Sequence, residues 1–293
     1  MQSIMNSTDI AFPHLGIYLK DVPDGFYIGS FRVAYYGVII GIGIFLGILM
    51  AVHCAKRINL DPEIIWDFAI YAIIFSIIGA RAYYVIFEWE HYKDDLLQIF
   101  NTRQGGMAIY GGVIGAFITL FVYCRIKKIK PFAIGDASVQ GLVLGQVIGR
   151  WGNFINREVF GEYSDGLLAM RLPIEAVRSR DISENLRAHI AEGTNYIQVH
   201  PTFLYESGLN LLLLIFMYLY IKHRRFDGEM CLIYLGGYGI IRFFVEGIRT
   251  DQLKIGNTGI AVSQLLGISL FVFAVLADVV VRVYLAKKNK ETA

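Results

Sequence analysis

Long apolar runs dominate this chain, and short polar segments separate them. Val33 to Ala55, Gly105 to Cys124 and Ile255 to Ala277 contain no charged residue. About 20 mainly apolar residues are enough for a helix to cross the hydrocarbon layer of a membrane, so each run predicts a transmembrane helix. Charged residues interrupt four further apolar stretches, which are also interpreted as spans: Ile65 to Phe87, Phe132 to Phe154, Phe203 to Ile221 and Glu229 to Ile248. Because backbone polar groups cannot stay unpaired in lipid, the spans should pack as a helix bundle. The pattern predicts an all-α integral membrane protein with seven transmembrane helices.

Composition and charge placement add an orientation to this prediction. The chain is 55% hydrophobic and only 18% charged, whereas a soluble domain carries about a quarter charged residues. Basic residues gather in the connections that follow spans one, three, five and seven: Lys56, Arg57, Arg125, Lys127, Lys128, Lys130, Lys222, Arg224, Arg225, Lys287, Lys288 and Lys290. Short basic connections stay in the cytoplasm. The N-terminus is therefore expected outside and the C-terminus inside.

Residues 1–293 are expected to form a single membrane domain with two external additions. Met1 to Lys20 lacks the basic start and apolar centre of a cleaved signal peptide. Residues 1–30 are therefore interpreted as an external N-terminal arm that lies on the membrane surface. Residues 158–201 form the long connection between spans four and five, and loops of this length usually have a function. They are expected to form a small extracytoplasmic head, with a short helix opening at Pro173.

Polar residues of five spans should meet at one depth. With about 1.5 Å of rise per residue, Tyr36 and Tyr110 lie near the outer ends of inward-running spans. Arg81, Arg150 and Arg242 come late in outward-running spans, which places them in the outer half as well.

Helical spacing places these residues on polar stripes, since positions i, i+4, i+7 and i+11 share one helix face. The stripes are Gln146, Arg150, Asn153 and Arg157 in span four, Tyr238, Arg242, Glu246 and Arg249 in span six, and Arg81, Tyr84 and Glu88 in span two.

An arginine at mid-bilayer costs roughly 2.5–3.5 kcal/mol on insertion scales and usually marks a site. Glu246 between Arg242 and Arg249 is as readily an internal ion network, and Arg81 near Glu88 is more readily a structural pair. Arg150 has no acidic residue at i±3 or i±4. We therefore expect it to bind an anionic ligand.

At outer-leaflet depth the simplest such ligand is a phospholipid phosphate, which guanidinium groups bind with two parallel hydrogen bonds. Asp136, near Lys130 at the inner end of span four, is expected to stabilise a helix N-terminus.

The stretch from Gly149 to Gly161 resembles a known signature. It matches the pattern G-R-x-G-N-F-x-N-x-E-x-x-G of the bacterial prolipoprotein diacylglyceryl transferases at every fixed position. The similarity continues over most of the chain, through Tyr35-Tyr36-Gly37, Gly105-Gly106-Met107, His200-Pro201, Leu204-Tyr205-Glu206, and Gly237-Tyr238-Gly239 to Arg242, Glu246 and Arg249.

The resemblance implies an enzyme of the bacterial plasma membrane that carries out the first step of lipoprotein maturation. Such enzymes move the diacylglyceryl group of phosphatidylglycerol to the lipobox cysteine of a prolipoprotein signal peptide and release glycerol 1-phosphate. The expected partners are these two substrates and membrane lipid. No cofactor, metal or nucleic acid is expected.

The resemblance also implies roles for single residues. Arg150 and Arg242 would stabilise the charge that develops on the departing phosphate and lower the pKa of the attacking thiol. Asn153 and Asn156 would bind head-group hydroxyls, and Glu158 would orient an arginine or the glycerol. The other expected substrate contacts are Tyr36, Gly161, His200, Tyr238 and Glu246.

One position departs from the family pattern. Tyr110 precedes Gly111-Gly112, where many relatives have a histidine assigned as the catalytic base. A phenol, whose pKa is about 10, is a poor base at neutral pH. Tyr110 is therefore a candidate base, hydrogen-bond donor or packing residue. His200 is an alternative base, although a helix start before Pro201 explains it equally well.

Three other classes of protein fit the sequence less well. A transporter or channel for an anionic solute needs polar residues along a full pore, whereas the inner halves of these spans are nearly apolar. An intramembrane protease needs a serine and histidine pair, two membrane aspartates or a metal-binding HExxH motif. A purely structural role fits poorly with three inward arginines.

Overall fold

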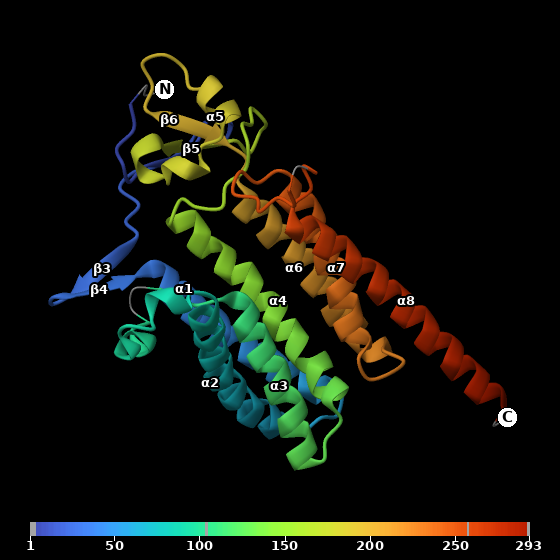
Figure 1. The fold of residues 1–293 in the computed structure, drawn as a ribbon. Helices are drawn as coiled ribbons and strands as arrows, with labels where there is room; N and C mark the ends of the chain where they lie inside the picture. The colour runs from blue at the N-terminus through green and yellow to red at the C-terminus, as the bar shows by residue number, and fades with distance from the viewer. Residues whose placement is uncertain (1–3, 103–104, 257, 292–293) are drawn as a thin grey trace.

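A computed structural model describes residues 4–102, 105–256 and 258–291. In these ranges seven helices are long and apolar enough to cross a membrane, which confirms the predicted number (Figure 1). They are α1 (Tyr35–Arg57), α2 (Pro62–Phe87), α3 (Ile109–Lys127), α4 (Pro131–Ile155), α6 (Thr202–Tyr220), α7 (Glu229–Gly247) and α8 (Val262–Glu291). The chain is mostly helical and not all-α, because six short strands accompany the helices.

Three antiparallel helix pairs are held by glycines that let their backbones touch. A Cβ atom added at Gly141 of α4 would lie 2.1 Å from the Gly47 carbonyl oxygen of α1. Gly79 of α2 meets Gly111 of α3, and Gly239 of α7 meets Gly267 of α8 in the same way. Helices in lipid associate by close van der Waals packing, and small residues at the contact allow it. Helix α6 packs on α4 and α7 and so joins the first pair to the third.

The α2–α3 pair joins the others through a core at the end of the bundle away from the head, here called the far end. Ile65 and Phe68 of α2 and Tyr123 of α3 pack in one buried cluster with Ala51 of α1 and Ile134 of α4. The other end, here called the head end, carries the small folded unit that follows α4 (Figure 1).

This head is a four-stranded antiparallel sheet rather than a helical insertion. Its strands run in the order β2 (Ile17–Leu19), β1 (Ile10–Phe12), β5 (Met170–Pro173) and β6 (Tyr196–Val199). The short helix α5 (Glu184–Ala188) packs beside them. The helix expected to open at Pro173 is reduced to one 3-10 turn, Ile174–Ala176, because β5 occupies the residues before it.

The N-terminal arm belongs partly to the head. Strands β1 and β2 come from the arm, and β1 pairs with β5 at Ala11 and Arg171. Residues 10–19 of the arm are therefore part of the head sheet, and the expected position of the arm on the membrane surface stays a prediction. Strands β3 (Gly25–Ile28) and β4 (Phe31–Ala34) form a separate hairpin that projects sideways before α1 (Figure 1).

Helix α8 begins later than the predicted seventh span, which started at Ile255. Gly256 and Gly259 have positive φ angles of 49° and 74°, and the described residues 255, 256 and 258–261 are not helical. The helix then continues past the predicted end, since Asp278 accepts a 2.6 Å hydrogen bond from the Arg282 Nε one turn later.

Two charged residues for which the sequence predicts structural roles, Arg81 and Asp136, stabilise the fold through partners distant in sequence. The Arg81 guanidinium donates to carbonyl oxygens of the α2–α3 connection, at Gln98, Ile99, Asn101, Gly105 and Gly106. Its predicted structural role stands, but its partners are carbonyls rather than Glu88.

Asp136 stabilises a helix N-terminus, as expected, but that of α7. It accepts backbone hydrogen bonds from Gly228, Met230 and Cys231. Its ion-pair partner is Arg224, at 2.7 Å, rather than Lys130.

Candidate functional site

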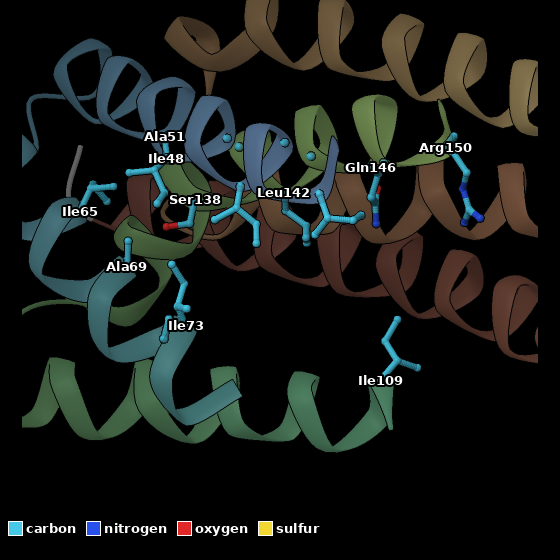
Figure 2. Close-up of a pocket in the computed structure, with 18 of the residues that line it drawn as sticks. Ile48, Ala51, Ile65, Ala69, Ile73, Ile109, Ser138, Leu142, Gln146 and Arg150 are labelled. Atoms are coloured by element: carbon cyan, nitrogen blue, oxygen red, sulfur yellow. The ribbon is translucent and has the colours of Figure 1, made fainter. Parts of the chain in front are cut away.

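A groove of about 490 Å³ runs along the contact between α1 and α4 (Figure 2). Arg150, Asn153 and Gln146 of α4 and Tyr36 of α1 line its head end. The rest is almost wholly apolar. Ile109 of α3 lines it from the opposite side (Figure 2). The groove therefore joins a cation with amide neighbours to a long hydrocarbon surface.

Arg150 has an acidic partner, which corrects the expectation from its own helix. Its Nη2 lies 2.5 Å from Oε1 of Glu206 on α6, and its Nη1 donates to Asn153 Oδ1 at 3.3 Å. The Glu206 side chain is only 1% exposed. Spacing along one helix cannot find a partner on another helix. The available signal was Glu206 itself, an acid in an otherwise apolar span.

Glu206 is shared by two arginines. Its Oε2 lies 3.3 Å from Nη1 of Arg242 on α7, which brings the two predicted catalytic arginines to one carboxylate. Arg150 lines the groove, and Arg242 joins the site through Glu206.

The ion pairs continue along α7. Arg242 pairs with Glu246 at 2.5 Å, and Glu246 with Arg249 at 3.5 Å. Arg249 then binds Asp251 with two hydrogen bonds of 2.8 and 2.7 Å. The internal ion network expected around Glu246 is confirmed.

The signature loop after α4 holds Asn153 in place. Glu158 Oε1 accepts hydrogen bonds from Asn153 Nδ2 at 3.0 Å and from Asn156 Nδ2 at 3.4 Å. Asn153 also accepts the bond from Arg150. Glu158 thus acts on Arg150 through Asn153, while its second oxygen lies 3.4 Å from Arg178 of the head.

Arg157 does not continue the polar stripe of α4. The helix ends at Ile155, and Arg157 has a φ of 53°, which turns it away from the helix face. Its Nη2 donates to the backbone oxygens of Thr8 and Val22. The residue therefore ties the N-terminal arm to the end of α4.

Gly161 and His200 lie side by side where the head meets α6 and α7. Gly161 donates its N–H to the His200 carbonyl, and an added Cβ would lie 2.8 Å from both the His200 Cβ and the Ile248 oxygen. Only glycine fits this contact. The His200 Nδ1 is 3.1 Å from the Tyr205 hydroxyl, and burial lowers the pKa of His200 below its ordinary value of 6.5. The imidazole is therefore mainly neutral at pH 7.

The three predicted tyrosines have different surroundings. The Tyr36 ring lines the groove and packs against Gly152. Tyr238 stacks on Tyr234 with ring centroids 5.4 Å apart and lies against Arg150.

Tyr110 does not share this environment. It is 53% exposed, and its ring lies 6.4 Å from that of Tyr83 on α2. Its neighbour Ile109 is the α3 residue that lines the groove.

The arrangement suits an amphiphilic anion. A guanidinium has five N–H donors, and the hydrogen bonds of Arg150 to Asn153 and Glu206 leave others for a ligand in the groove. The apolar walls then take the hydrocarbon part of the same molecule. Among the described residues no group of three or more histidine, cysteine or acidic side chains gathers as metal ligands.

Removal of the shared carboxylate tests the ion network. We expect Glu206→Ala to lower the free energy of unfolding by about 3–5 kcal/mol, because it leaves two buried guanidinium groups without their common partner. The measurement is thermal unfolding of the detergent-solubilised protein. Glu90→Ala removes an exposed carboxylate, paired with Lys93 on the surface, and should change stability by about 1 kcal/mol or less. Equal unfolding temperatures for the two variants would contradict the prediction.

Comparison with known proteins identifies the family. Residues 23–280 match the prolipoprotein diacylglyceryl transferase family. The chain is 39% identical over 267 residues to a phosphatidylglycerol–prolipoprotein diacylglyceryl transferase of Finegoldia magna, covering 91% of this chain and 98% of the relative. It is 40% identical over 261 residues to the enzyme of the same name from Bacillus cytotoxicus, covering 87% and 90%. A Clostridium perfringens relative, numbered 1 under that name, is 38% identical over 270 residues, covering 92% and 97%. With its multi-pass helical bundle, this chain is a membrane enzyme that belongs to the prolipoprotein diacylglyceryl transferase family.

Proposed function

We propose that this protein transfers the diacylglyceryl group of phosphatidylglycerol to the lipobox cysteine of prolipoproteins, as the first step of bacterial lipoprotein maturation. The observation that carries the proposal is Arg150 at the polar end of an apolar groove. A phospholipid matches both parts, with its phosphate at the guanidinium and its hydrocarbon along α1 and α4. The names of the relatives support the same two substrates.

The proposed reaction is a displacement at the phosphate-bearing carbon of the diacylated glycerol. The thiolate sulfur of the lipobox cysteine attacks this carbon, and the carbon–oxygen bond to the phosphate breaks. A thioether forms, and glycerol 1-phosphate leaves with the bonding electrons. Arg150 stabilises the negative charge that develops on the leaving phosphate, and Arg242 adds to the same positive field. That field also lowers the pKa of the incoming thiol.

The carboxylates of the site are proposed to position the arginines. Glu206 is hydrogen-bonded to both, and an arginine held by fixed partners needs little rearrangement during the reaction. Asn153, Asn156 and Glu158 form one hydrogen-bonded group beside Arg150. We assign the two asparagines to the head-group hydroxyls and Glu158 to holding them.

The orientation proposed is head end outward, in the plasma membrane of a bacterium. The far end carries the basic residues, including Arg57 at the end of α1 and Lys128 after α3, and short basic connections stay in the cytoplasm. The head (residues 158–201) and the arm (residues 1–30) then lie outside, on one membrane domain. The site faces the outer leaflet, where exported prolipoproteins arrive.

Labelling of single cysteines checks this orientation. A cysteine at Gly193 in the head should react with a membrane-impermeant maleimide in sealed cells, and one at Lys128 should react only after the membrane is opened. Cys54 and Cys124 are buried, and the partly buried Cys231 lies in the first turn of α7 at the far end, so background labelling from outside should be low. Labelling of position 128 in sealed cells would reverse the proposed orientation.

The phosphate site is tested at Arg150. We expect Arg150→Ala to abolish diacylglyceryl transfer from phosphatidylglycerol to a lipobox peptide, while the protein remains folded in gel filtration. Arg150→Lys should lose most activity as well, because an ammonium does not reproduce the planar fork of a guanidinium. Arg125→Ala, at the exposed far end of α3, should keep wild-type activity. Activity of Arg150→Ala within about threefold of the wild type (less than 1 kcal/mol in the barrier) would rule out the assignment.

Tyr110 is proposed to donate a hydrogen bond to a phosphate oxygen from the α3 side of the groove. The loss of one charge-assisted hydrogen bond of roughly 1.5–3 kcal/mol means that Tyr110→Phe should slow transfer about 10–100-fold. Tyr110→His should keep substantial activity, since an imidazole can donate from the same place. The measurement is the initial rate against pH for all three proteins. A Tyr110→Phe variant as fast as the wild type would leave the hydroxyl without a catalytic role and favour His200.

A further inference from the structure

The far part of the groove is lined by different helices from its head end. On α1 and α4 the lining residues follow the groove for its whole length, from Tyr36 to Ala51 and from Asn153 to Ser138. On α2 they occupy only the far half: Ile65, Phe68, Ala69, Ala72 and Ile73, which share one helix face. Beside Arg150, α1 and α4 form the walls and Ile109 of α3 lies opposite (Figure 2). Beyond Leu142, α1, α4 and α2 form three walls, here called the three-walled part.

The far end of the groove is closed. Ile65, Phe68 and Ala51 line it there and are also members of the buried core that joins α2 and α3 to the other helices. Ile65 is 1% exposed. A hydrocarbon chain that enters from Arg150 therefore reaches a blind end and not the opposite membrane surface.

The length of the groove matches one leaflet. Arg150 and Ser138 are separated along α4 by about 18 Å, at 1.5 Å of rise per residue. Half of the ~30 Å hydrocarbon layer is about 15 Å. An acyl chain attached to a glycerol phosphate at Arg150 thus ends among Ala51, Ala69 and Ala72.

Small side chains leave room near the closed end of the groove. Ala51 of α1 and Ala69 and Ala72 of α2 line the three-walled part, and Ile73 of α2 lies next to them on the side of Arg150. Larger side chains at the alanine positions would shorten the space available to the end of a chain.

We propose that the three-walled part of the groove, at Ala69, Ala72 and Ile73 of α2, selects the acyl-chain length of the phospholipid donor. One of the two chains occupies the three-walled part, and the other leaves through the open side near Arg150 into the bilayer. A chain gains little by moving from lipid to an apolar groove, since lipid tails are as apolar as leucine. Selection therefore comes from shape, because a close-packed wall cannot accept a terminal methyl group that is too deep.

This inference rests on the proposed function, and a competition experiment tests it separately. The purified enzyme in detergent receives dilauroyl- and distearoyl-phosphatidylglycerol in equal amounts with one lipobox peptide. Mass spectrometry of the modified peptide gives the ratio of the two products. A general loss of activity cancels in this ratio, so only selection between chain lengths changes it.

We expect Ala69→Phe to raise the ratio of dilauroyl to distearoyl product about tenfold over the wild type, because the ring fills the space that the longer chain needs. Ile73→Ala enlarges the same space, so it should lower the ratio of dilauroyl to distearoyl product. This variant tests the proposal if Ala69→Phe does not fold. Ala82→Phe is the matched control. It places the same side chain at an exposed position of α2 outside the groove and should leave the ratio within about twofold of the wild type.

The outcomes separate the two hypotheses. If the wild type transfers neither lipid, the proposed function fails. If it transfers both and the ratio is the same in all groove variants, chain-length selection at this end is wrong. An equal shift in Ala82→Phe would also overturn it, because the effect would then not come from the groove.

Discussion

The sharing of Glu206 by Arg150 and Arg242 is the interaction on which the site depends. A charged side chain within a bilayer is costly unless it is paired, and here one buried carboxylate pairs two guanidinium groups from different helices. This arrangement requires α4, α6 and α7 to meet at one level. It also holds both guanidinium groups in position. In the proposed function, the pairing that lowers the cost of these charges in the membrane also orients them for a phosphate.

The signature sequence after Arg150 has mainly a positioning role in this structure. Asn153 connects Arg150 to Glu158, Arg157 ties the N-terminal arm to the end of α4, and Gly161 lets the chain pass between His200 and Ile248. A pattern with many fixed residues is often interpreted as a list of substrate contacts. Here Asn153 and Glu158 hold Arg150 in place, and of the fixed residues only Gly149, Arg150 and Asn153 line the groove.

Most of the helical bundle could be predicted from the sequence, because length and hydropathy decide which segments cross a membrane. The polar stripes also placed Gln146, Arg150 and Asn153 correctly on one face, since helical spacing is regular until α4 ends at Ile155. Partners on other helices could not be predicted in this way. The pairing of Arg150 with Glu206 depends on how α4 and α6 pack, and that packing leaves no periodic signal in either segment.

The pairing of strands in the head could not be predicted from the sequence either. Strands β1 and β5 are separated by the first four membrane helices and are only three and four residues long, too short for a pattern of alternation. Their pairing follows from tertiary position, which Arg157 helps to set by binding the backbone at Thr8 and Val22. Local sequence therefore predicts where the chain enters the membrane better than how its external segments meet.

The shape of the groove follows from the glycine contacts that hold the helices together in pairs. Gly47 and Gly141 bring the backbones of α1 and α4 together, and the groove runs along this contact. The α2–α3 pair, held together by its own glycines, lines the far part of the groove with α2 and reaches its head end only with Ile109 of α3. In the proposed function, a membrane lipid enters from the side beside Arg150, and its charged head stays at the arginines. Glycine contacts thus determine which helices are neighbours and which of them line the groove.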